Sequence, residues 1–224
     1  MPILAVIGCG SISRFHLRAF AETGATVAVV CDPRLAVAQE QAARFTAVAT
    51  ADWREALRHP QVDTVAIFTP SPHHVAIAQA ALESGKHVIC EKTLTLNAAD
   101  SLTLTRLAAA KGVLLYTNYM KRFFPATVKA RELLPRLGRI VGVHVRTHQI
   151  APCDLLDGGH HDFFFPKAGA VSDIRQMSGG GVLVCAGSHM LDLLLHLVGK
   201  PNEVYGKSWI RKDADVDFTT HGLL

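Results

Sequence analysis

The sequence predicts an α/β protein whose first part is a mostly parallel, doubly wound β-sheet. About the first 120 of the 224 residues alternate short apolar runs with helical patterns, and parallel neighbouring strands need such crossover helices. A glycine turn, residues 8–10, directly follows the first apolar run. Hydrophobic residues make up 49% of the chain and charged residues 19%, which is enough to fill a core and excludes a disordered protein.

The elements of this first part follow from apolar runs and from stop signals. Residues 3–7 are all apolar, as in a strand buried on both faces. Asn97 is a typical helix N-cap, and Gly112 is a typical helix end. The predicted strands are 3–7, 26–31, 46–49, 62–68, 86–90 and 113–116. The predicted helices are 11–22, 34–44, 51–58, 73–83 and 97–110.

The regular alternation of predicted strands and helices ends at about residue 120, which predicts two domains, 1–120 and 121–224. The elements expected in the second domain are a helix over 124–136, a strand over 139–149, a functional loop over 151–178, a helix from the glycines at 179–181 to about 198, and a strand over 203–211. Two strands are too few for an independent sheet. Residues 213–224 look like the opening of a further strand, so we expect a truncated domain of a longer protein.

Composition and charge exclude several classes of protein. The net charge is +4 without any basic run, which argues against nucleic-acid binding. The five cysteines are scattered and odd in number, so we expect free thiols in a reducing, cytoplasmic compartment and no bound metal. The longest uncharged stretch, residues 64–82, is interrupted by Pro70 and Pro72, and the N-terminus lacks a basic signal-peptide region. We therefore expect no membrane partner.

The glycine turn indicates a dinucleotide site. In such a turn the first glycine, here Gly8, permits the tight turn, and the second, Gly10, lets a pyrophosphate approach the backbone. Amides of the helix that begins at Ser11 and Ile12 would hold the anion. Ser13 stands where the third glycine of the fingerprint belongs, and glycines in any strand-to-helix turn remain the alternative explanation.

An acidic residue stands at the expected distance from this turn. Asp32 lies 22 residues past Gly10, at the end of the second strand, where a carboxylate binds the ribose hydroxyls of NAD. Arg34, two residues on, would instead pair with the 2′-phosphate of NADP. We expect NAD, with NADP possible.

Five motifs in order resemble the Gfo/Idh/MocA oxidoreductases: residues 8–16, 69–74, 85–92, 122–125 and 179–192. The resemblance runs across essentially the whole chain. It implies an NAD(P)-binding Rossmann domain followed by an α/β open-sheet substrate and oligomerisation domain. It also implies hydride transfer at a CH–OH or C=O carbon of a sugar, a cyclitol or a related polyhydroxylated small molecule, by a homo-oligomer.

The resemblance also assigns site residues. It adds to the cofactor-binding set Thr69, Pro70, Ser71, His74, Glu91 and Lys92. Lys92 would be catalytic by stabilising alkoxide charge, and His189 would transfer the proton. The substrate-binding residues would be Arg122, Cys185 and Asp192. Independently of the resemblance, the loop cluster 160–162 is either a further substrate contact or a solvated turn.

Three positions depart from the family pattern. Ser71 replaces a common asparagine, Thr93 replaces the proline after the lysine, and Cys185 replaces an aspartate that supports the histidine in many relatives. A non-catalytic NAD(P)-binding sensor or structural relative is therefore the alternative function. A reductase of C=N or C=C bonds shares the fold and is a third interpretation, which residues 179–192 disfavour.

Overall fold

The structure is a computed structural model that describes residues 1–146, 175, 179–210 and 216–223. The chain divides into two compact units, Met1–Asn118 and Tyr119–Leu224, and each is described here by itself.

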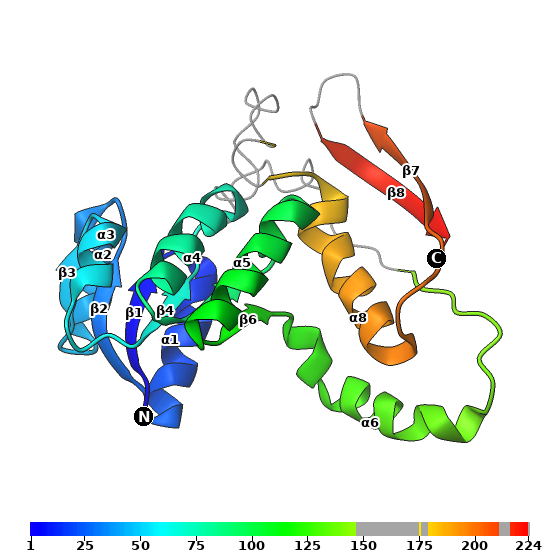
Figure 1. Ribbon diagram of the computed structural model, residues 1–224, viewed down its shortest axis with the longest axis horizontal. Coiled ribbons are helices and arrows are strands. Elements are labelled where there is room, and N and C mark those ends of the chain that lie inside the picture. The colour runs from blue at the N-terminus through cyan, green and yellow to red at the C-terminus, as the bar shows by residue number, and fades with distance from the viewer. Residues whose placement is uncertain (147–174, 176–178, 211–215, 224) are drawn as a thin grey trace. The chain divides into compact units, whose positions relative to one another are not determined.

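The first unit is built on a six-stranded parallel sheet (Figure 1). The strands lie in the order β3-β2-β1-β4-β5-β6, and every neighbouring pair is parallel. Their bounds are β1 Ile3–Ile7, β2 Thr26–Cys31, β3 Val48–Thr50, β4 Thr64–Ile67, β5 His87–Glu91 and β6 Leu115–Asn118. The predicted doubly wound fold class is confirmed. The chain runs outward in opposite directions from β1, so a crevice forms at the carboxyl ends of β1 and β4, where such sheets bind ligands.

Five α-helices cover the two faces of this sheet. They are α1 Ser11–Thr23, α2 Leu35–Ala43, α3 Trp53–Arg58, α4 His74–Glu83 and α5 Ala98–Lys111. Because strand side chains alternate, Ala5 and Ile7 join one buried cluster with residues of α3, α4 and α5. Leu4 and Val6 face the other cluster, which contains residues of α1 and α2.

The predicted helix ends are present in the structure. The Asn97 side chain caps α5 by accepting a hydrogen bond of 2.9 Å from the Asp100 amide. Gly112 ends the same helix with a φ of 66°, a left-handed conformation that glycine adopts without a steric penalty.

The second unit is more irregular. Its described elements are the 3₁₀ turns η2 Met120–Phe123 and η3 Leu134–Leu137, the helices α6 Pro125–Leu133 and α8 Ser188–Val198, the π-helix η6 Leu183–Gly187, and the strands β7 Tyr205–Ile210 and β8 Asp217–Leu223. β7 and β8 form an antiparallel pair, so the further strand expected within 213–224 is present. Helix 124–136 is also present, although its last turn is 3₁₀.

One predicted strand is wrong over its described part. Residues 139–146 have no strand structure, while 147–149 lie outside the described residues. The valines alternate as in a strand, but a strand also needs a neighbour to bond. Val141 is 92% exposed, and neither sheet of the described residues includes this segment.

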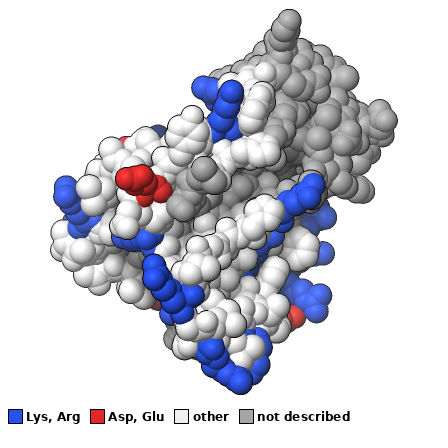
Figure 2. All heavy atoms as spheres, turned by 90° about the vertical axis from the view of Figure 1, so that its right-hand side faces the viewer, with Lys and Arg blue, Asp and Glu red and all other residues white. Residues whose placement is uncertain are grey.

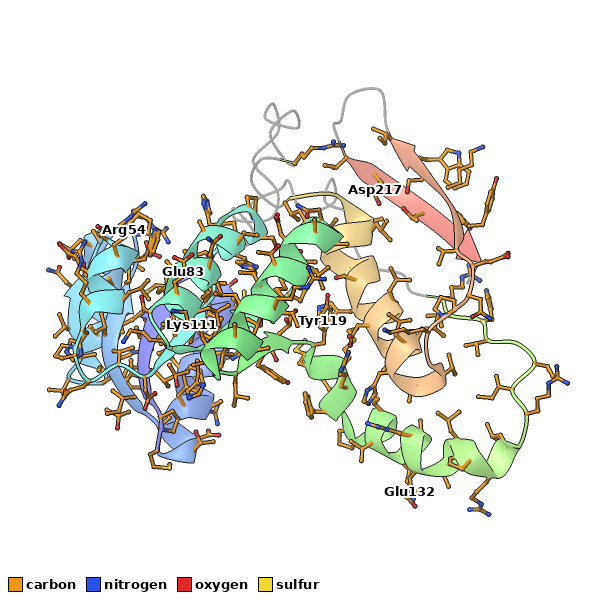
Figure 3. All side chains as sticks on the ribbon, in the orientation of Figure 1. Arg54, Glu83, Lys111, Tyr119, Glu132 and Asp217 are labelled. Atoms are coloured by element: carbon orange, nitrogen blue, oxygen red, sulfur yellow. The ribbon has the colours of Figure 1, made fainter. Side chains whose placement is uncertain are left out.

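The glycines before α8 allow close approach to β8. A Cβ atom on Gly181 would lie 2.1 Å from the carbonyl oxygen of Asp217. Asp217, labelled in Figure 3, accepts a hydrogen bond of 2.8 Å from the Leu183 amide and so fixes the start of η6 to the start of β8. The segment that leads to His189 is therefore anchored to β8 by a hydrogen bond to the Asp217 side chain.

Two general features bear on earlier expectations. No helix among the described ranges is long and apolar enough to span a membrane. On the face drawn in Figure 2, Lys and Arg side chains occur in several separate groups.

Candidate functional site

The glycine turn packs directly against the end of β4. Gly8 has a φ of 97°, and a Cβ atom there would lie 2.7 Å from the carbonyl carbon of Phe68 and 2.9 Å from the Thr69 nitrogen. Only glycine fits a left-handed position with backbone this close. The structure thereby brings two predicted motifs, 8–13 and 69–74, side by side at the crevice between β1 and β4.

Gly10 has a different environment. It occupies the N-cap position of α1, has no side chain to cap the helix, and a Cβ atom there would meet no atom within 4 Å. Ser13, in place of the third glycine, is completely buried, and its hydroxyl donates a hydrogen bond of 2.6 Å to the Gly10 carbonyl. The amides of Ser11 and Ile12 begin a helix whose N-terminus attracts anions.

Asp32 follows the end of β2 and is held beside the glycine turn. Its carboxylate accepts hydrogen bonds of 3.0 Å from the amides of Cys9 and Arg34, and one of 3.1 Å from Arg34 Nε. Burial favours a higher pKa for this carboxyl, but the bonds from Arg34 and Cys9 outweigh it, and the pKa lies below its ordinary value. Asp32 is therefore charged, while the Arg34 side chain that it binds is 70% exposed.

The residues after β4 include a buried polar atom in a residue that lies beside the glycine turn. Thr69 Oγ1 is buried and has no hydrogen-bond partner among the described residues. Pro70 then leads into the single 3₁₀ turn that begins at Ser71, which is half-buried. An unpaired buried hydroxyl costs free energy, which a ligand oxygen or amide would recover.

His74 begins α4 and has no exposed surface. Its Nδ1 lies 2.8 Å from the carbonyl oxygen of Thr93, and its Nε2 lies 2.8 Å from that of Thr69. Burial lowers the pKa of the imidazole, although both carbonyls and Glu91 act in the opposite direction. Both ring nitrogens thus face backbone carbonyls, of which a neutral imidazole donates to one, and the assignment of His74 to the cofactor site stays a prediction.

Glu91, the last residue of β5, is the centre of a polar network. His16 Nε2 lies 2.9 Å from its carboxylate, Asn118 Nδ2 donates to the same oxygen at 2.5 Å, and the Lys92 amide donates to the other at 3.2 Å. Burial would raise the pKa of Glu91, but the bonds from His16 and Asn118 outweigh it, so the pKa is lowered.

Two members of this network have no assigned role in the sequence prediction. His16 belongs to the first motif, residues 8–16, and its ring stacks on Phe68 at a centroid distance of 4.2 Å. Asn118 ends β6, so its position at the carboxyl edge of the sheet was the available signal.

Lys92 is half-buried and follows this network directly. The peptide bond between Lys92 and Thr93 is cis. Both residues that flank Lys92 have polar contacts. The Glu91 carboxylate contacts His16 and Asn118, and the Thr93 carbonyl contacts His74.

The second unit contains four of the residues assigned by resemblance, and it pairs two of them, Arg122 and Asp192. His189 lies in the first turn of α8, with the Tyr119 ring edge-on to it at a centroid distance of 6.0 Å. Arg122 binds the buried carboxylate of Asp192 through two hydrogen bonds, that from Nε being 2.8 Å long. Cys185 lies in the π-helix η6, and its Sγ contacts the Gly180 carbonyl at 3.7 Å. Such π-helical turns occur often at functional sites.

Two other expectations concern metals and the loop. Within the part of the chain that the structure describes, no three His, Cys, Asp or Glu side chains gather as a metal site. The loop over 151–178 and its cluster 160–162 lie outside the described residues, apart from Arg175.

The sheet order, with a glycine turn at the crevice and a buried carboxylate after β2, defines a dinucleotide-binding α/β protein of the Rossmann class. The chain belongs to the Gfo/Idh/MocA oxidoreductase family. Residues 4–119 match the family's NAD-binding Rossmann domain, and residues 127–224 match its C-terminal domain. The resemblance inferred from the motifs is thus confirmed.

Individual relatives are dehydrogenases of polyhydroxylated compounds. Inositol 2-dehydrogenase of Rhodococcus jostii is 38% identical over 124 residues, which are 54% of this chain and 34% of that protein. Levoglucosan dehydrogenase of Pseudarthrobacter phenanthrenivorans is 28% identical over 190 residues, or 81% of this chain and 45% of that protein. The chain therefore aligns with less than half the length of these curated relatives.

Solved structures agree with this assignment. A levoglucosan dehydrogenase in complex with NADH and levoglucosan is 25% identical, with a TM-score of 0.79 over 98% of this chain and 62% of that one. The WlbA dehydrogenase from Bordetella pertussis, in complex with NADH and UDP-GlcNAcA, is 23% identical with a TM-score of 0.84, over 98% of this chain and 65% of that one, and shows the shared fold.

Proposed function

We propose that the protein is an NAD(P)-dependent oxidoreductase that transfers a hydride between a nicotinamide cofactor and a CH–OH or C=O carbon of a sugar, cyclitol or related small molecule. The crevice between β1 and β4 carries this proposal, because an open helix N-terminus at Gly10 follows β1, and Thr69, which follows β4, has a buried hydroxyl with no partner among the described residues. The inositol and levoglucosan dehydrogenases among its relatives support the substrate class.

The residues of the first unit fit a dinucleotide. The amides of Ser11 and Ile12 would bind the pyrophosphate, and Asp32 would accept hydrogen bonds from the ribose hydroxyls. The hydroxyl of Thr69, with Pro70 and Ser71, would line the nicotinamide end. When bound, the cofactor supplies the acceptor or donor of the hydride. The negative charge of Asp32 favours NAD, and the exposed Arg34 leaves NADP binding open.

Lys92 and His189 would perform the chemistry on the substrate. The Lys92 ammonium would donate to the substrate oxygen and stabilise negative charge that develops on it. His189 would accept the proton of the hydroxyl during oxidation and return it during reduction. Arg122, Cys185 and Asp192 would bind substrate hydroxyls in the second unit, and the ion pair between Arg122 and Asp192 fixes the direction of both groups.

The second candidate function is a non-catalytic NAD(P)-binding sensor. Thr93 and Cys185 favour it, because they replace residues that support the lysine and the histidine in the family pattern. Both functions include cofactor binding, so only turnover distinguishes them.

The test is therefore binding followed by turnover. We expect NADH fluorescence to change on binding, and we expect a panel with myo-inositol, D-xylose and levoglucosan to contain a substrate. Lys92→Met should leave the NADH affinity within a few-fold and lower turnover by roughly 10²–10⁴. His189→Ala should behave alike, while Lys111→Met, an exposed lysine of the same unit, serves as control. Binding without turnover on the whole panel would favour the sensor.

Three broader assignments belong to the same proposal. Residues 1–120 would be the dinucleotide-binding domain, and 121–224 part of the substrate and oligomerisation domain. We propose a homo-oligomer, to be tested by sedimentation. The cysteines at 9, 31, 90 and 185 are free thiols, which fits a cytoplasmic location.

A further inference from the structure

We propose that Asn118 is a cofactor-binding residue whose side-chain carbonyl oxygen, Oδ1, accepts a hydrogen bond from the carboxamide NH₂ of the nicotinamide. The proposal rests on the function proposed above, because it needs a nicotinamide dinucleotide in the crevice. It adds a cofactor contact from β6, a strand in which the sequence motifs assign no cofactor-binding residue.

Asn118 lies at the edge of the sheet where a ligand is expected. It is the last residue of β6, and in the parallel strand pair it lies opposite Glu91, the last residue of β5. Ligands of doubly wound sheets bind at the carboxyl ends of the strands. Asn118 is half-buried at that edge, so its side chain has a defined environment and is still accessible.

The order of the strands indicates which part of the cofactor reaches this position. The sheet consists of two halves, β1–β3 and β4–β6, and each half of such a sheet holds one nucleotide. Asp32 follows the middle strand of the first half, where it would bind a ribose, and Glu91 ends the middle strand of the second half. Asn118 lies one strand farther from the crevice than Glu91. Because the base of a nucleotide lies beyond its ribose, we expect the nicotinamide to reach Asn118.

The contacts of Glu91 determine which way the Asn118 amide points. The lowered pKa of Glu91 keeps this carboxylate ionised, so its oxygens only accept hydrogen bonds. Oε1 lies 2.9 Å from His16 Nε2 and 2.5 Å from Asn118 Nδ2, so both nitrogens donate to it, and the 3.1 Å between these nitrogens separates two donors. In the reversed amide, Oδ1 would take the place of Nδ2 beside the negative oxygen and be repelled by it. The hydrogen-bond network therefore fixes the direction of the amide.

This direction turns a hydrogen-bond acceptor away from the carboxylate. Oδ1 of Asn118 has no hydrogen-bond partner among the described residues, and it is not fully enclosed by protein. The carboxylate of Glu91 has less capacity left, because His16, Asn118 and the Lys92 amide already occupy three of its roughly four lone-pair positions. The acceptor that the end of β6 offers to a ligand is therefore Oδ1, and the carboxamide NH₂ of nicotinamide is a matching donor.

The first experiment changes the ligand and leaves the protein intact. In reduced 3-acetylpyridine adenine dinucleotide, a methyl group replaces the carboxamide NH₂, while the carbonyl group beside it remains. In titration calorimetry the wild-type protein should bind this analogue about 5–10-fold more weakly than NADH, which is the effect of one lost hydrogen bond.

The second experiment removes the acceptor. Asn118→Leu keeps nearly the same shape without polar atoms, so NADH should bind about 5–10-fold more weakly than to wild type, and the preference for NADH over the analogue should disappear. Affinity for ADP-ribose, which lacks the nicotinamide, should stay within a few-fold of wild type. Asn202→Leu, at an exposed asparagine of the second unit, is the matched control and should leave all three affinities unchanged.

The variant may be less stable, because Glu91 loses a donor in it. Retained ADP-ribose affinity shows that the variant is folded, and Asn118→Ala replaces it in all titrations if it does not fold. The same expectations apply to Asn118→Ala.

Three results would overturn the proposal. They are equal binding of NADH and the analogue by wild type, a preference for NADH that persists in the Asn118 variant, and an equal loss of NADH and ADP-ribose affinity in a folded variant, which would assign the contact to the ribose. If wild type binds neither NADH nor ADP-ribose, the proposed function itself fails and this contact fails with it. If wild type binds both but does not discriminate against the analogue, only the contact of Asn118 with the carboxamide fails.

Discussion

The two glycines of the β1–α1 turn should respond oppositely to the same substitution. In Gly8→Ala the new methyl would lie 2.7 and 2.8 Å from the carbonyl carbon and oxygen of Phe68, and the backbone would keep a φ of 97°. A left-handed conformation costs a residue with a Cβ roughly 1–2 kcal/mol, and overpacking costs typically about 1–3 kcal/mol. We expect a loss of about 2–5 kcal/mol in the free energy of unfolding, out of a total of about 5–15 kcal/mol.

Gly10→Ala should leave stability nearly unchanged. The position has a φ of −71°, and nothing lies within 4 Å of the new methyl. Alanine is a poorer N-cap than glycine, so we expect a cost below about 1 kcal/mol. NADH affinity should fall about 10–100-fold, because the methyl occupies the space through which a pyrophosphate would reach the helix amides, and a lost hydrogen bond to a charged group is worth about 1.5–3 kcal/mol.

Urea unfolding and NADH titration measure the two effects independently. Gly8→Ala should lower the urea midpoint without changing the slope m, and Gly10→Ala should leave the midpoint nearly in place. A Gly10→Ala protein that binds NADH like wild type would refute the assignment of the turn to the pyrophosphate. A Gly8→Ala protein of wild-type stability would refute the close approach of β1 and β4.

Three further outcomes are expected. Asp32→Ala should weaken NADH binding more than NADPH binding, because it removes the charge that repels a 2′-phosphate and leaves Arg34 in place; equal losses in the two titrations would contradict this. Glu91→Gln should make the free energy of unfolding less dependent on pH in the acid range. The folded-state pKa of Glu91 is lowered from 4.5, so its stabilising contribution is present above that value and is lost as the pH falls below it. Urea unfolding of both proteins along the acid range checks the difference. Ser13→Ala should cost about 1 kcal/mol in urea unfolding by removing the bond to the Gly10 carbonyl, and an unchanged midpoint would show that this bond is not net stabilising.

The first unit was predictable because its signals are local. A buried parallel strand is an apolar run such as residues 3–7, and helix ends carry their own markers, such as Gly24 and Gly112 in left-handed conformations. The predicted third strand, 46–49, begins two residues too early, because Thr46 is in a turn with a φ of 55° and β3 begins only at Val48. Nothing in the residue types there separates a turn from a strand.

The second unit was less predictable because its structure depends on distant partners. Residues 139–146 have the alternation of a strand, yet a strand forms only where another backbone bonds to it, and local alternation carries no information on that neighbour. The π-helical turn before α8 depends likewise on contact with Asp217, 34 residues from the Leu183 amide that it binds.

The candidate site shows the same limit at the level of single side chains. Motif positions placed His74 and Glu91 at the correct edge of the sheet, because the carboxyl ends of parallel strands meet there. They did not show what those side chains bind. The partners of His74 are carbonyls 5 and 19 residues away, and every residue has a carbonyl, so no residue type marks them. A histidine matched to a family motif can therefore be correctly located and still have contacts that no motif marks.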